Sequence, residues 1–247
     1  MIERRIEMSS EEGTLDAALF LPTGSGPSPL VVFYMDAFGL RPALTDMAGR
    51  LVEAGYAVLQ PNLYWRTGPF APFEPSKTFS DPGERERVMK LLNSVRVEQV
   101  VADTLALVGE VAGDPRLRAE RFGCVGYCMG GRIAFGVTTE LPDRVVACAA
   151  IHPGGLVTDA PDSPHRKARR IRGVVYLGIA DEDGSCSLEH QEALREALGA
   201  AGVRYTLEIY PGARHGFAVP DHSVYDAEAA ERHWARVLAL FGAELGT

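Results

Sequence analysis

The chain has 247 residues, of which 46% are hydrophobic and 23% charged, a composition typical of a globular protein that excludes a disordered or fibrous chain. A chain of this length buries roughly 70 to 75% of its unfolded surface, so its core needs no disulfide or metal to hold it. Because 25 lysines and arginines stand against 33 aspartates and glutamates, the net charge is −8, which argues against a nucleic acid as partner.

The first two predicted elements are strands at residues 2–8 and 14–21, expected to form an antiparallel hairpin around Gly13. Prolines and glycines interrupt the uncharged stretch 17–35, which excludes a membrane helix there. The N-terminus has no apolar segment of the kind that a secretory signal carries, and the four cysteines show no metal-binding spacing. We therefore expect a cytoplasmic protein that binds no membrane, metal or other cofactor.

Short apolar runs then alternate with longer segments of helical period. The runs predict six buried strands, at residues 30–34, 57–60, 122–125, 145–151, 174–179 and 205–210. Apolar residues at every third or fourth position predict five helices, at residues 43–54, 84–111, 131–139, 187–200 and 227–241. This alternation is typical of βαβ units and a mostly parallel sheet, and it predicts a single domain spanning residues 1–247.

Two irregular stretches, 66–81 and 158–170, are expected to be loops inserted into that domain. The first carries three phenylalanines among prolines, Phe70, Phe73 and Phe79. Such a loop can form an apolar lid over a site, or a satellite cluster that seals the core, and the sequence leaves both open. The basic run 166–170 in the second loop predicts solvated side chains.

The strand predicted at 122–125 ends in the motif G-Y-C-M-G-G, residues 126–131, which leads into a helix. A sharp strand-to-helix turn needs glycines on both sides of its central residue, as in a nucleophile elbow, here with sulfur in place of oxygen. Cys128 would be the nucleophile, at a helix N-terminus that favours a thiolate. The Met129 amide would face a developing oxyanion. Alternatively, the glycines only pack a strand against a helix, and Cys128 is a small buried hydrophobic residue.

A nucleophile in this turn requires an acid and then a histidine later in the chain, each after a strand. Asp181 follows the strand predicted at 174–179, and His215 follows the last predicted strand. Asp183 is an alternative acid, because a shift of two residues in the loop would exchange the two aspartates. His152, which also follows a strand, is an alternative base.

With Cys128, Asp181 and His215 the chain resembles the dienelactone hydrolase (carboxymethylenebutenolidase) family of the α/β-hydrolase superfamily. Besides the cysteine motif, the likeness rests on D-A-F-G at 36–39, G-Y-A-V at 55–58, P-N-L-Y at 61–64 and G-A-R-H-G-F at 212–217. The resemblance implies an α/β-hydrolase fold, with a mostly parallel central sheet flanked by helices on both faces. It also implies cofactor-free hydrolysis of small esters or lactones.

The resemblance also assigns roles near the first central strand. A carboxylate before the x-F-G turn of the family contacts the resting thiol until substrate displaces it. This chain has Asp36 where the family usually has glutamate, so the reach to Cys128 is one methylene shorter. Asp36 could alternatively be a turn-capping residue. The Ala37 amide would be the second oxyanion donor.

For substrate binding, the resemblance points to Arg85 and to Tyr127, which precedes the nucleophile. Arg85 lies in a charged run that is more often the solvated start of a helix. The second arginine with which the family holds a substrate carboxylate is replaced by Val219. We therefore expect that dienelactone itself is not the preferred substrate.

The sequence thus predicts a hydrolase of small lactones or esters that uses a Cys-His-Asp triad and a thioester intermediate. Its partner is then a small molecule, and the protein is a monomer or a homodimer. The alternative is a protein of the same fold that binds a ligand without turning it over, or that senses oxidants through Cys128.

Overall fold

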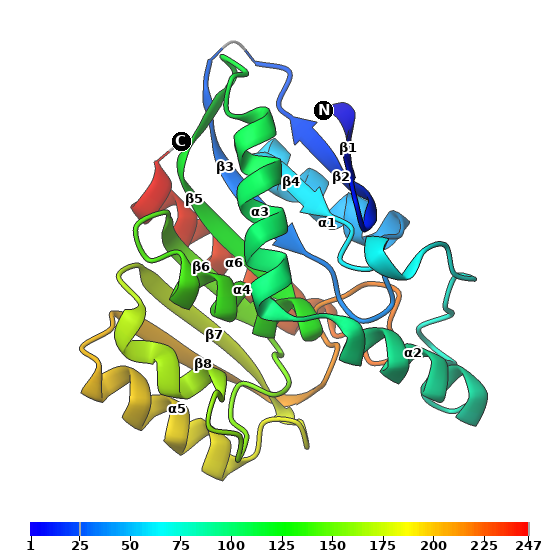
Figure 1. Ribbon diagram of the computed structural model, residues 1–247. Helices are drawn as coiled ribbons and strands as arrows, with labels where there is room; N and C mark the ends of the chain where they lie inside the picture. Colours follow the sequence, from blue (N-terminus) through cyan, green and yellow to red (C-terminus); the bar gives the residue numbers. More distant parts are fainter. Residues whose placement is uncertain (25, 247) are drawn as a thin grey trace.

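A sheet of eight strands runs through the computed structural model, which describes residues 1–24 and 26–246 (Figure 1). The strand order is β1-β2-β4-β3-β5-β6-β7-β8. Strands β1 and β2 form the predicted antiparallel hairpin, β2 pairs antiparallel with β4, and all other pairs are parallel. The strands are β1 Ile2–Ser10, β2 Gly13–Leu21, β3 Ser28–Tyr34, β4 Ala57–Pro61, β5 Leu117–Tyr127, β6 Val145–Ile151, β7 Val174–Glu182 and β8 Tyr205–Arg214.

Helices cover both faces of this sheet, as predicted. In Figure 1, α3 and α4 lie in front of the sheet and α6 lies behind it. None of the described helices combines the length and apolar character that a membrane crossing would require. The helices are α1 Pro42–Glu53, α2 Pro82–Ser94, α3 Val97–Val111, α4 Met129–Glu140, α5 Leu188–Ala200 and α6 Ala227–Leu245, with short 3-10 helices η1 Trp65–Thr67 and η2 Pro164–Arg170.

The central parallel strands are buried on both faces, and this explains why they are nearly continuous apolar runs. Every residue of β6 is buried, and its bounds are those predicted from the sequence. Strands β5, β7 and β8 are longer than their apolar runs. Parallel strands all end at the same edge of the sheet, so the loops after β3, β5, β7 and β8 meet there.

The single helix predicted at 84–111 is wrong, because the structure divides it into α2 and α3. Val95 and Arg96 have extended backbone between the two helices, with ψ of 120° and 135°. The Ser94 hydroxyl donates a hydrogen bond to the Leu91 carbonyl and helps to end α2. Since apolar residues continue at helical spacing on both sides, periodicity alone cannot reveal the break. The break lets α3 pack on the body of the protein while α2 projects from it (Figure 1).

The basic run 166–170 is the 3-10 helix η2, where the sequence predicted an irregular loop. Lys167 and Arg170 both form ion pairs with Glu140 at the end of α4, with nitrogen–oxygen distances of 3.1 and 2.8 Å. Part of the positive charge of this run is therefore neutralised within the protein.

Candidate active site

Cys128 stands in a strained turn between β5 and α4. Its φ is 55° and its ψ −116°, values that residues with a side chain rarely adopt. A Cβ on Gly126 would lie 2.0 Å from the Gly130 carbonyl oxygen, and one on Gly130 would lie 2.2 Å from the Tyr34 carbonyl oxygen. Both glycines are therefore required by close backbone packing, which gives the turn the geometry of a nucleophile elbow.

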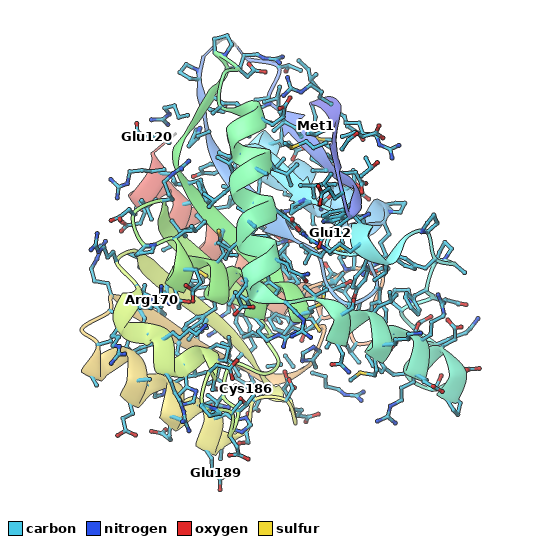
Figure 2. The ribbon with its side chains drawn as sticks, viewed as in Figure 1. Met1, Glu12, Glu120, Arg170, Cys186 and Glu189 are labelled. Atoms are coloured by element: carbon cyan, nitrogen blue, oxygen red, sulfur yellow. The ribbon has the colours of Figure 1, made fainter. Side chains whose placement is uncertain are left out.

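Cys128 is also the only cysteine of the described residues that is not buried. Burial raises the pKa of the Cys124 thiol well above its usual value, that of Cys148 to about 12 and that of Cys186 to about 11. Cys186, for example, is buried just before the start of α5, near the labelled Glu189 (Figure 2). The other three thiols thus lack the access and the thiolate character that a nucleophile needs.

His215 lies directly after β8 and bonds to an aspartate after β7. Its Nδ1 is 2.7 Å from an Asp183 carboxylate oxygen. Ser185 holds the other oxygen of Asp183 through its backbone N–H, at 2.8 Å, and its hydroxyl, at 2.6 Å. Asp183 is thereby fixed on three sides, and its bond to Nδ1 leaves Nε2 of His215 for another partner.

The structure pairs His215 with Asp183 and not with Asp181, the residue that the sequence favoured. Strand β7 continues to Glu182, three residues beyond its predicted end, so Asp181 is still part of the strand. Its side chain is exposed and accepts a hydrogen bond from the Gly212 backbone N–H, at 3.1 Å. Asp183, the alternative, is the first residue after the strand and the one that bonds to His215.

The charges around His215 favour its protonated form. Burial works against the imidazolium, but the negative charge of Cys128 and the bond to Asp183 outweigh it and raise the pKa of His215 well above its usual value. Burial likewise opposes ionisation of Asp183, and the hydrogen bonds from His215 and Ser185 overcome it, so the pKa of Asp183 is lowered. Cys128 and Asp183 thus both favour the charged form of the same imidazole.

His152, the alternative base, is fully buried beside His215, with the two ring centroids 5.1 Å apart. Neither of its ring nitrogens has a hydrogen-bond partner among the described residues. Burial, followed by the nearby histidines His215, His222 and His233, lowers the pKa of His152 well below its usual value. His152 is therefore a neutral packing residue of the site, and no carboxylate orients it as Asp183 orients His215.

The Met129 and Ala37 amides, expected to bind an oxyanion, belong to the start of α4 and to the turn after β3, and Tyr64 contacts both residues. The Tyr64 hydroxyl donates a hydrogen bond to the Ala37 carbonyl at 2.8 Å and lies 3.6 Å from the Met129 sulfur. Neither amide N–H donates to a backbone acceptor in the described part of the chain. Two unpaired donors on adjoining segments are the arrangement that an oxyanion requires.

Asp36, expected to contact the resting thiol, is held by other groups. Arg41 bonds to both of its carboxylate oxygens, at 2.7 and 2.8 Å, and His222 Nε2 lies 3.1 Å from the second. The Phe38 N–H donates to the first carboxylate oxygen of Asp36, at 3.0 Å. No hydrogen bond joins Asp36 to Cys128 in the described chain, so the expectation of a gate is corrected. Its alternative, a turn-capping carboxylate, is the role that the structure supports.

Arg41 in turn binds Asp221 through Nε, at 2.6 Å, and through a second nitrogen, at 2.8 Å. We call Asp36, Arg41, Asp221 and His222 the ionic clamp. Asp36 is completely buried, and although burial alone would raise its pKa, hydrogen bonds from His222 and Arg41 lower it. The clamp thus ties the loop that carries Ala37 to the loop that follows His215.

The two predicted substrate-binding side chains are not at the thiol. Tyr127 is fully buried, with its hydroxyl 3.1 Å from His233 Nε2 on α6 and its ring 5.3 Å from that of Phe33. The Tyr127 side chain is thus enclosed in the core, and a contact between it and a substrate stays a prediction. Arg85 lies exposed on α2 without an ion pair in the described chain, and its role stays a prediction.

The aromatic loop between β4 and α2 packs on the turn after β3. Phe73 and Phe79 lie with their rings 6.1 and 5.6 Å from that of Phe38, and Phe70 lies 5.5 Å from Tyr64. Phe73 is buried, whereas Phe79 is 53% exposed. The satellite cluster left open by the sequence is therefore present, and it covers the loop that carries the Ala37 amide. A lid motion stays a prediction.

Sequence analysis missed five residues of this region: Ser185, Tyr64, Arg41, Asp221 and His222. Tyr64 belongs to one of the motifs that carry the family resemblance, and Ser185 follows the acid in a short polar loop. No local pattern connects Arg41 with Asp221, which is 180 positions away. No cluster of histidine, cysteine and acidic side chains in residues 1–24 and 26–246 is arranged to hold a metal ion.

Comparisons with known proteins agree with this geometry. The sequence model of the dienelactone hydrolase family matches residues 15–245. A Synechocystis protein provisionally named carboxymethylenebutenolidase is 30% identical over 227 residues, covering 91% of this chain and 89% of its own. The Pseudomonas putida carboxymethylenebutenolidase is 27% identical, covering 93% and 92%. A crystal structure from Klebsiella pneumoniae, provisionally named dienelactone hydrolase, superimposes with a TM-score of 0.83 at 26% identity and covers 98% and 99%.

Proposed function

The chain belongs to the dienelactone hydrolase family of lactone and ester hydrolases, and we propose that it works through a thioester on Cys128, with His215 and Asp183 completing a triad. The observation that carries the proposal is the position of His215. Its Nδ1 bonds to the buried carboxylate of Asp183, and Cys128, the one cysteine of the described residues that is not buried, helps to raise the pKa of the imidazole. This is the arrangement of nucleophile, base and orienting acid in thiol and serine hydrolases.

In the first step the Cys128 thiolate attacks the carbonyl carbon of the ester or lactone. Its proton resides on His215, whose imidazolium is stabilised by Asp183. The tetrahedral oxyanion is bound by the amides of Ala37 and Met129. As the carbon–oxygen bond breaks, His215 returns its proton to the departing alkoxide, which leaves a neutral hydroxyl and an acyl group bound to sulfur.

In the second step water cleaves the thioester. His215 takes a proton from the water, the resulting hydroxide adds to the acyl carbon, and the oxyanion occupies the same two amides. The carbon–sulfur bond then breaks, and the thiolate remains paired with the imidazolium. Because thiolate leaves more readily than alkoxide or amide, lactones and activated esters suit this site better than amides.

The alternative of a ligand-binding or thiol-sensing protein is not favoured. The family and the relatives named above are hydrolases. A thiol sensor needs a second accessible cysteine, whereas Cys124 and Cys148 are fully buried in neighbouring strands. Val219, where the family resemblance expects an arginine, is apolar and completely buried, so the preferred substrate differs from dienelactone.

The test is hydrolysis of 4-nitrophenyl esters, simple lactones and a dienelactone by the wild type, Cys128→Ala and the matched variant Cys186→Ala. Activity should vanish in Cys128→Ala and persist in Cys186→Ala, whose thiol is buried. Iodoacetamide should label Cys128 selectively, as located by mass spectrometry. Full activity of Cys128→Ala on every substrate that the wild type cleaves would refute the proposal.

A further inference from the structure

Among the described residues, only two that carry a side chain have a positive φ, Cys128 at 55° and His152 at 36°. They stand next to each other at the ends of β5 and β6. The residues before them, Tyr127 and Ile151, are register partners, and the Cys128 N–H donates to the Ile151 carbonyl at 3.0 Å. A positive φ in such residues costs free energy and is found most often at functional sites. The elbow explains the strain at Cys128, and the strain at His152 calls for a separate reason.

The imidazole of His152 is costly as well. It is completely buried, and neither ring nitrogen has a hydrogen-bond partner among the described residues. Burial lowers the pKa of His152, so the ring is neutral, but an unpaired polar group inside a protein is still destabilising. A phenylalanine would fill similar space without unpaired nitrogens. What distinguishes histidine is that it combines a ring with a tolerance for positive φ.

The ring of His152 lies against the proposed base. Its centroid is 5.1 Å from that of His215, with 61° between the ring planes, and 5.4 Å from that of Phe217, with 72° between the planes. Both contacts have the edge-to-face geometry that aromatic rings prefer. Phe217 in turn stacks on Tyr210 of β8, with the centroids 4.7 Å apart. His152 is thus packed among buried rings and gives His215 a rigid neighbour.

The mechanism proposed above requires such a neighbour. Nε2 of His215 must face the thiol, the departing oxygen and the attacking water in turn. Asp183 and the Ser185 hydroxyl both approach the ring at Nδ1, at 2.7 and 3.2 Å. A ring held at one atom can still turn about that atom, and the His215 side chain is 30% exposed. A fixed surface beside the ring is therefore needed to keep Nε2 in place.

We propose that His152 is a positioning residue, whose neutral ring holds the imidazole of His215 in the orientation in which Nε2 reaches the thiol and the water. The inference rests on the proposed function, because that function makes His215 the base. The strained backbone places the ring of His152, and the neighbouring aromatic side chains hold it there. A displacement of about 1 Å in a reacting group can slow catalysis about 100-fold, which explains why a destabilising residue occupies this position.

The experiment uses two variants that separate the ring of His152 from its backbone. Asparagine accepts a positive φ but has no ring, whereas phenylalanine has a ring but accepts a positive φ less readily. With 4-nitrophenyl acetate, His152→Asn should lower kcat by about 10- to 100-fold with KM little changed. His152→Phe should restore most of the wild-type kcat. The control is His233→Asn, which removes a fully buried imidazole of α6, 4.9 Å from the ring of Trp234, and should leave kcat unchanged.

A second measurement does not depend on turnover. Proton NMR of protein labelled with ¹⁵N in its histidines follows the proton on Nδ1 of His215, which resists exchange with water while the bond to Asp183 holds. Its signal should be sharp in the wild type and in His152→Phe, and broadened or absent in His152→Asn. Thermal unfolding checks that each variant folds; if His152→Asn does not, His152→Gln replaces it in both measurements.

Wild-type kcat in His152→Asn would overturn the inference, since the ring would then only fill space. A loss of kcat without a change in the NMR signal would overturn it too, as would a loss that His152→Phe does not restore. Unchanged hydrolysis by Cys128→Ala would instead overturn the proposed function, whatever the NMR signal of His215 shows.

Discussion

Two clusters of side chains at the carboxyl edge of the sheet each contain an aspartate bonded to a histidine. They differ in the residues that surround this pair. In the reactive cluster, Cys128, His215 and Asp183, a carboxylate bonds to an imidazole at 2.7 Å. In the ionic clamp a carboxylate, Asp36, lies 3.1 Å from the imidazole of His222. Only the first imidazole has a thiol beside it, and only the second carboxylate is neutralised by an arginine.

The difference shows that an aspartate–histidine pair does not by itself indicate catalysis. Arg41 bonds to both oxygens of Asp36, and two nitrogens of the same guanidinium bond to Asp221, so the charge of Asp36 is already neutralised. Asp183 instead leaves its charge available to the imidazolium that forms on His215. A network in which every charged group is already paired stabilises the structure. A network in which a group is left without a partner can take part in proton transfer.

The largest expected effect separates Asp181, at the end of β7, from Asp183, the first residue after that strand. Asp183→Asn should lower kcat/KM by about 10³- to 10⁴-fold, because an amide in that place favours the wrong tautomer of His215. Asp181→Asn removes an exposed charge and keeps an oxygen that can accept from the Gly212 N–H, so it should change kcat/KM by less than about twofold. Steady-state kinetics on one ester measures both. The opposite ranking would restore Asp181 as the acid.

Next in size is the ionic clamp. Arg41→Ala leaves Asp36 buried without its main partner and should cost about 3 to 5 kcal/mol of unfolding free energy. The double variant Asp36→Asn/Arg41→Ala should cost less than the sum of the two single changes, because neither uncompensated charge remains. Urea unfolding measures each value. Additive effects would show that the two residues do not interact.

The two clusters should also differ in how pH changes stability. The pKa of His215 is raised in the folded protein, so its contribution is present below about pH 6.5 and is lost as pH rises through the folded pKa. The pKa of Asp36 is lowered, so its contribution is present above about pH 4 and is lost as pH falls. Each slope reaches at most about 1.4 kcal/mol per pH unit.

Urea unfolding between pH 3 and 10 tests these opposite signs. His215→Ala should remove part of the alkaline decline, and Asp36→Asn should remove part of the acid decline. If both substitutions altered the stability on the same side of the pH profile, the His215 and Asp36 pairs would depend on pH in the same way. The difference between the two clusters would then be refuted.

The smallest effect concerns the link between the segments that carry the two oxyanion amides. Tyr64→Phe removes the hydrogen bond to the Ala37 carbonyl while keeping the ring. We expect kcat to fall by about 3- to 10-fold, with KM little changed, because the loss is that of one neutral hydrogen bond that positions a donor. Tyr176→Phe, which alters a hydroxyl bonded to Tyr210 on β8, is the control. A change in KM alone would assign Tyr64 to substrate binding.

Much of the fold could be predicted because its signals are local. The apolar run of β6 ends where the strand ends, and the glycines around Cys128 specify a turn that only they can form. His215 was found by its place after the last strand. Each of these features depends on residues within a few positions of each other, whose steric and burial requirements are written in the sequence itself.

Only the tertiary structure decided which groups those residues meet. Asp183 replaces Asp181 because β7 runs on until Glu182, a length set by pairing with β8. Asp36 bonds to Arg41 and to His222, the latter 186 positions away, and not to the thiol. The sequence by itself determined most of the elements, the glycine turn around Cys128 and the chain order of the proposed reactive residues. The partner of each buried charge depended on distant segments that meet only in the folded chain.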